Sequence, residues 1–93
     1  MLGTVKSEIG VIFEKDKYKV VRKSGKAGDT IPKHSHEGEE IVFSVICGKV
    51  EVELAGKEKY ELNCCDVLNF DGTNSISAKF IEDSEVVITL IKK

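Results

Sequence analysis

The chain has 93 residues, 32% of them charged, and its 14 lysines and arginines nearly balance 16 aspartates and glutamates to a formal net charge of −2. This length allows one domain with one core, and the charge balance argues against nucleic acid as a partner. The sequence shows no signal-peptide pattern and no apolar run of membrane-spanning length. We therefore expect a cytoplasmic protein with no membrane partner.

The first 25 residues predict two strands. The apolar stretch 11–13 and the segment 18–21, which is apolar except at position 19, supply the strands, and the polar turn 14–17 joins them. A domain of this size buries only about 60–65% of the surface that its unfolded chain exposes, so pairing with a second copy would stabilise it. We therefore expect a homodimer, with residues 1–25 as a candidate for part of its interface.

Two later stretches, residues 41–47 and 86–91, are nearly continuous apolar runs. Such runs are typical of strands that are covered on both faces. We expect one face of each strand to line the core. The other face is then a candidate for contact with another sheet or with the second copy.

Strict alternation of apolar and charged residues makes 49–54 the clearest strand, and a short turn at 55–56 leads to its hairpin partner, 57–62. Residues 75–80 alternate in the same way. The residues that should point inward from this strand are Ile76, Ala78 and Phe80. With only one proline and many short apolar stretches, the chain predicts about nine short antiparallel strands in an all-β sandwich or barrel.

Only two histidines occur in the chain, and they lie two positions apart, at His34 and His36. This spacing puts both imidazoles on one face of an extended segment. Gly38 then allows a turn that brings the carboxylate of Glu40 back beside them. Two imidazoles and one carboxylate suit a divalent Fe, Mn, Ni or Zn ion with open coordination positions. The alternative is a solvated polar loop without an ion.

The segment from Gly28 to Glu40 resembles the first motif of the cupin superfamily, in which a glycine, a His-x-His pair and a glutamate follow at fixed spacings. Gly28, His34, His36 and Glu40 match those spacings. Gly48 lies one residue beyond the place of the next motif glycine. Either a bulge absorbs the extra residue, or the inward carboxylate is that of Glu39 instead.

The second cupin motif is degraded in this chain. Residues 65–76 keep an aspartate and an apolar strand, but several motif residues are replaced, and Ile76 stands where the motif places a metal-binding histidine. The replaced positions are Cys65, Asp71, Thr73, Ile76 and Phe80. An isoleucine cannot coordinate a metal ion, so the resemblance implies a reduced site with two histidines and one glutamate.

The resemblance implies an all-β double-stranded β-helix, a cupin or jelly-roll barrel, formed by a single domain over residues 1–93 and matched most closely over 26–91. For an enzyme it implies a metal-dependent dioxygenase or isomerase, and it implies no organic cofactor. The expected function is binding of a divalent transition metal, a small molecule, or both, in the barrel. The alternative is a metal-free module that binds a small ligand or has a structural role.

The residues assigned to the metal site are His34, His36 and Glu40. Further residues expected to line the pocket are Ser44, Tyr60, Phe70 and Ile76. No side chain stands out as a general acid or base, so no catalytic residue is assigned.

The three cysteines, Cys47, Cys64 and Cys65, do not have the spacing of a zinc ribbon or a disulfide framework. We expect reduced thiols that are buried as small apolar side chains. Neighbouring strand residues point to opposite faces, so Cys64 and Cys65 are not expected to form a redox pair.

Overall fold

A computed structural model describes residues 2–93, and in this part of the chain nine strands and no helix are found. The strands are β1 Gly10–Glu14, β2 Tyr18–Gly25, β3 Thr30–His34, β4 Glu39–Cys47, β5 Lys49–Leu54, β6 Glu58–Asn63, β7 Val67–Asp71, β8 Ile76–Phe80 and β9 Ser84–Lys92. The all-β class and the number of strands expected from the sequence are confirmed. Residues 2–93 contain no helix with the length and apolarity needed to cross a membrane.

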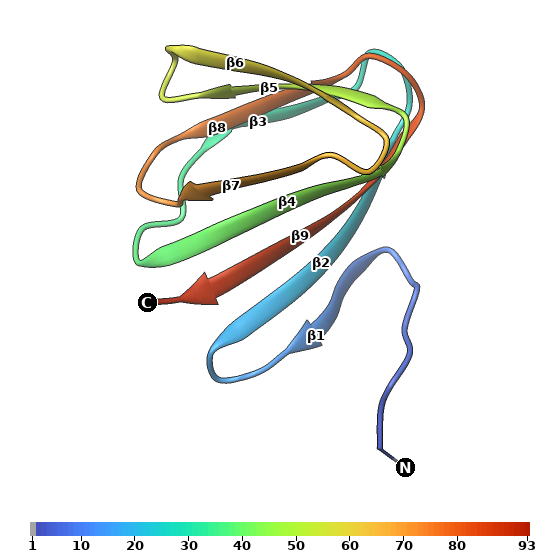
Figure 1. Ribbon diagram of the computed structural model, residues 1–93, viewed down its shortest axis with the longest axis vertical. Helices are drawn as coiled ribbons and strands as arrows, with labels where there is room; N and C mark the ends of the chain where they lie inside the picture. Colours follow the sequence, from blue (N-terminus) through green and yellow to red (C-terminus); the bar gives the residue numbers. More distant parts are fainter. Residues whose placement is uncertain (1) are drawn as a thin grey trace.

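The strands form two antiparallel sheets that face each other. One sheet has the order β1-β2-β9-β4-β7 and the other the order β3-β8-β5-β6. The chain passes repeatedly from one sheet to the other, which is the connectivity of a double-stranded β-helix. In Figure 1 the two layers converge at the right and lie further apart at the left. We call the two facing layers the cup, and the left-hand end of Figure 1 its open end.

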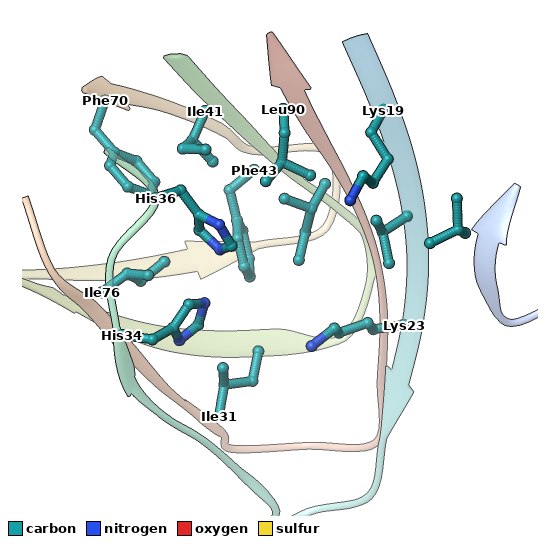
Figure 2. A pocket seen from close by; sticks show the side chains of 13 residues that line it. Lys19, Lys23, Ile31, His34, His36, Ile41, Phe43, Phe70, Ile76 and Leu90 are labelled. Carbon is teal, nitrogen blue, oxygen red and sulfur yellow. The ribbon is translucent and has the colours of Figure 1, made fainter. Parts of the chain in front are cut away.

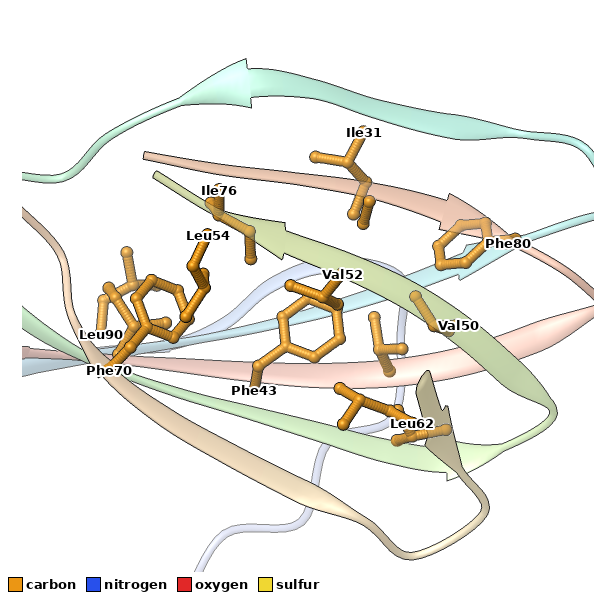
Figure 3. Packing of buried hydrophobic residues seen from close by; sticks show 14 residues of the cluster. Ile31, Phe43, Val50, Val52, Leu54, Leu62, Phe70, Ile76, Phe80 and Leu90 are labelled. Carbon is orange, nitrogen blue, oxygen red and sulfur yellow. The ribbon is translucent and has the colours of Figure 1, made fainter. Parts of the chain in front are cut away.

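The core lies between the two sheets and consists of the inward residues of each strand. On β4 these are Ile41, Phe43 and Val45, and on β5 they include Val50 and Val52, which have no exposed surface. Figure 3 shows Phe43, Val50 and Val52 among the side chains that lie between the sheets. Burying one such side chain contributes about 1.5–3 kcal/mol. The inward placement of Ile76, Ala78 and Phe80 is likewise confirmed, since each is at most 6% exposed.

The two long apolar strands, β4 and β9, are covered on one face only in the single chain. Their inner residues are buried, whereas Val42 and Val87 on the outer face are half-buried and Ile46 and Ile91 are exposed. Cover of this outer face by a second copy stays a prediction.

The expected burial of the cysteines is wrong, because all three are exposed free thiols. Cys64 and Cys65 lie in the turn between β6 and β7 and not on a strand. Their side chains therefore do not point to opposite faces, and the two sulfur atoms lie 3.6 Å apart. The turn is tight because the amide of Asn63 donates a 2.7 Å hydrogen bond to the Asp66 carboxylate. Hydrogen bonding to Cys65 raises the pKa of the Cys64 thiol, which favours the unreactive protonated form.

Cys65 also explains one departure from the second cupin motif. Its φ is 72°, in the left-handed region that usually requires the glycine found at this motif position. The backbone at this position therefore has a conformation that glycine adopts readily, although the residue is a cysteine. A non-glycine residue in this conformation costs about 1–2 kcal/mol.

Candidate functional site

The open end of the cup contains a pocket of about 200 Å³ between the two sheets. Its lining is apolar except for four basic side chains, two histidines and two lysines (Figure 2). The apolar lining residues are Val11, Val21, Ile31, Ile41, Phe43, Phe70, Ile76, Ile88 and Leu90. An apolar hollow with a few polar groups is the usual form of a small-molecule site, although this one is smaller than the common range of about 300–1,000 Å³.

His34 and His36 are brought together at the pocket as the sequence predicts. His34 ends β3, and its ring lies edge-on to that of His36, with the ring centroids 4.8 Å apart. The Nδ1 atom of His34 lies 2.7 Å from the carbonyl oxygen of Pro32. Because a carbonyl only accepts hydrogen bonds, Nδ1 carries a proton, and Nε2 is the ring nitrogen left to contact a ligand.

The loop that carries His36 is held against Gly72. The amide of His36 donates to the Gly72 carbonyl, and the Gly72 amide donates to the Glu39 carbonyl, each over 2.8 Å. A Cβ atom on Gly72 would lie 2.3 Å from the carbonyl oxygen of His36, so only glycine fits here. Gly72 received no role in the sequence motif, where the neighbouring Thr73 occupies the glycine position.

The structure does not bring Glu40 to the histidines. Ile41 and Phe43 of β4 point inward, so strand alternation places Glu39 on the inner face and Glu40 on the outer face. Outside the cup, the Glu40 carboxylate accepts a 3.0 Å hydrogen bond from Asn69 and lies 4.0 Å from the Lys93 ammonium group. Glu39 has one carboxylate oxygen 3.7 Å from Nδ1 of His36. The geometry therefore favours Glu39, the alternative that the sequence left open.

Two of the four residues expected to line the pocket do so, and two do not. Phe70 and Ile76 are buried and line it. Ser44 shares the outer face of β4 with Glu40, because it lies between the inward Phe43 and Val45. Tyr60 packs against the core cluster, lines a separate hollow with Leu54 and Phe70, and donates a 2.6 Å hydrogen bond to Glu58.

Two lysines of β2 line the pocket and were not expected to. Lys19 and Lys23 point into it from the side opposite the histidines, with Val21 between them in sequence (Figure 2). The signal in the sequence is the period-two spacing of positions 19, 21 and 23, which puts both lysines on the face of the apolar Val21.

The surroundings of His36 disfavour its charged form. Partial burial lowers its pKa below 6.5, the neighbouring His34, Lys19 and Lys23 lower it further, and only Glu39 acts to raise it. His36 is therefore neutral at pH 7 and can donate or accept a hydrogen bond.

The donor set does not fit a resident divalent metal ion. Among residues 2–93, no group of three histidine, cysteine, aspartate or glutamate side chains has a geometry that could hold one. Ile76 faces the two imidazoles, Glu40 points away from them, and the lysine ammonium groups in the same pocket repel a cation. A two-histidine, one-carboxylate centre needs all three donors on one side.

No protein-family model matches this sequence, and no curated protein matches it. The fold, however, is close to that of several solved cupins. An RmlC-like cupin from Desulfovibrio desulfuricans superposes with a TM-score of 0.82 at 23% identity, over 98% of this chain and 92% of the other. This protein has the cupin fold.

Two further solved structures resemble this protein closely in fold. KdgF from Halomonas sp. is 25% identical, with a TM-score of 0.81 over 89% of this chain and 76% of that one. The cupin domain of Schizosaccharomyces pombe Cnp3 is 19% identical, with a TM-score of 0.82, and the match covers 90% of this chain and 63% of that one. At these identities the likeness concerns the fold, and the activity has to be argued from the site.

The titration of His36 gives a direct check of the pocket electrostatics. In His34→Ala protein, His36 is the one remaining histidine, and its imidazole signal in NMR spectra should titrate below pH 6.5 because burial, the largest cause, remains. The unfolded chain then binds the proton more readily, so the contribution of His36 to stability falls as the pH drops below 6.5. Lys23→Met should raise the pH midpoint of the His36 titration, because Lys23 lowers the His36 pKa, and Glu39→Gln should lower the midpoint, because Glu39 raises that pKa. A midpoint at or above 6.5 would contradict this description of the pocket.

Proposed function

We propose that this cupin binds a small organic molecule in the pocket at the open end of the cup, without a resident metal ion. The observation that carries the proposal is the apolar pocket of about 200 Å³ with two imidazoles at its edge. Apolar contact supplies most of the affinity in such a site, and a few polar groups fix the orientation of the ligand. His34, through Nε2, and the neutral His36 are the groups assigned to contact it.

Transition-metal binding and the dioxygenase or isomerase activity implied by the family resemblance are less well supported. Both need a third ligand beside His34 and His36, and the nearest candidate, Glu39, does not line the pocket. Of the two ligands expected from the sequence, a small molecule and a transition metal, we therefore propose only the small molecule. The homodimer and the cytoplasmic location stay predictions.

Closing the pocket with a larger side chain tests the proposal. Val21 lines the pocket, whereas Val20 is half-buried on the opposite face of β2, so Val21→Phe and Val20→Phe make a matched pair. The probes are cyclohexanecarboxylate and its neutral amide, titrated in EDTA and followed by NMR. We expect Val21→Phe to weaken the binding of whichever probe binds by about tenfold or more, while Val20→Phe changes it less than about twofold.

Thermal unfolding of both variants shows whether each is folded. If neither probe binds the unmodified protein, or if Val20→Phe weakens binding as much as Val21→Phe, the proposed function is wrong.

A further inference from the structure

Every polar side chain that lines the pocket is basic. The four are Lys19, Lys23, His34 and His36, and no aspartate or glutamate among residues 2–93 lines it. The chain as a whole has a net charge of −2, so this concentration of basic groups does not reflect an excess of lysine elsewhere. The positive charge is local to the pocket.

The two lysines are only weakly compensated by the protein itself. Lys19 has one ion-pair partner, Glu14, whose carboxylate oxygen lies 3.8 Å from the ammonium nitrogen and is largely exposed. Lys23 forms no ion pair within the described part of the chain. Both lysine side chains reach solvent at the edge of the pocket, since the Lys19 side chain is 40% exposed and Lys23 is exposed, and a negatively charged ligand beside them would be attracted to both.

We infer that the ligand of the cup is a small organic acid whose anionic group contacts Lys19 and Lys23 while its apolar body lies against Ile41, Phe43 and Ile88. This inference rests on the proposed function and names the ligand class. In Figure 2 the lysine nitrogens approach from β2 and the imidazoles from the opposite wall, with the apolar side chains between them. A ligand that spans this pocket meets ammonium groups at one side and hydrogen-bonding imidazoles at the other.

The two probes of the pocket experiment distinguish this inference from the proposed function. Cyclohexanecarboxylate and cyclohexanecarboxamide have nearly the same shape and differ in charge. We expect the acid to bind about tenfold or more tightly than the amide, and the preference to shrink as salt is added. In the double variant Lys19→Met, Lys23→Met the two probes should bind about equally, because methionine keeps the apolar stem and removes the charge.

The matched control is the double variant Lys15→Met, Lys17→Met, which makes the same change of charge in the turn between β1 and β2. It should keep the preference for the acid. Equal binding of acid and amide to the unmodified protein overturns the inference and leaves the proposed function standing, whereas absence of binding by both overturns the two together. If inorganic phosphate alone binds as tightly as the acid, the apolar body plays no part and the inference is also wrong.

Discussion

Gly72→Ala is expected to disrupt the histidine end of the cup and to abolish binding of the probe. The added Cβ atom would lie 2.3 Å from the carbonyl oxygen of His36 and 2.7 Å from that of Glu39, and backbone atoms cannot rotate away as a side chain can. Both hydrogen bonds that attach this loop to Gly72 should break. Overpacking and the lost hydrogen bonds together should lower the free energy of unfolding by about 2–4 kcal/mol, measured by urea denaturation.

Gly56→Ala is a matched control for that experiment. Gly56 lies in the turn between β5 and β6 with φ of 64°, and a Cβ atom there would have no contact closer than 3.9 Å. This variant should cost about 1–2 kcal/mol through backbone strain and leave probe binding unchanged. A Gly72→Ala protein as stable as the unmodified one, with full probe binding, would show that the loop is not held in this way.

Ile76→His is expected to strengthen the binding of a transition metal at the pocket. Ile76 is 5% exposed, lines the pocket and is the pairing partner of His34 across β3 and β8. A third imidazole beside His34 and His36 should strengthen Zn²⁺ or Ni²⁺ binding by about 10- to 100-fold, measured by calorimetry. The loss of apolar burial should cost about 2–4 kcal/mol of folding stability.

Ile76→Gln is the control for this gain, because it introduces a polar side chain of similar length that is a poor metal ligand. The metal content of unmodified protein, purified without a histidine tag, provides the second comparison. If the unmodified protein holds a transition metal in a one-to-one ratio and His34→Ala removes it, the proposal that the pocket works without a resident metal ion is wrong. If Ile76→His gains no more affinity than Ile76→Gln, the imidazoles do not converge as described.

The fold was predictable because its signals are local and repeated. Alternation over residues 49–54 and 75–80 fixes which side chains point inward, and the His34 and His36 spacing identifies the open end of a cupin. A shift of one residue in strand register would turn charged side chains into the core, so the alternation determines which face of each strand is buried.

The carboxylate and the lysines illustrate what the sequence left undecided. The turn at Gly38, with φ of 84°, breaks the alternation between His36 and β4, so spacing alone cannot say whether Glu39 or Glu40 faces inward. The inward face of β2 was readable from Val21, but a lysine can lie on a solvated face as readily as in a pocket. Only the packing of β2 across from β3 shows that Lys19 and Lys23 meet the histidines.

The cysteines and Gly72 depend on contacts between segments far apart in the sequence. Residues 64–65 look like strand positions until the turn between β6 and β7 is known, and the need for glycine at position 72 comes from the carbonyl groups of another loop. Such close approaches leave no periodic trace in a single sequence.

The central claim is that the cup binds an organic molecule without a metal ion, and mapping the bound probe on the isoleucine methyl groups tests it most directly. With EDTA present, cyclohexanecarboxylate should shift the methyl signals of Ile31, Ile41 and Ile76, which line the pocket, and leave that of the exposed Ile46 unchanged. Shifts confined to Ile46, or binding that appears only when a divalent metal is added, would contradict the account.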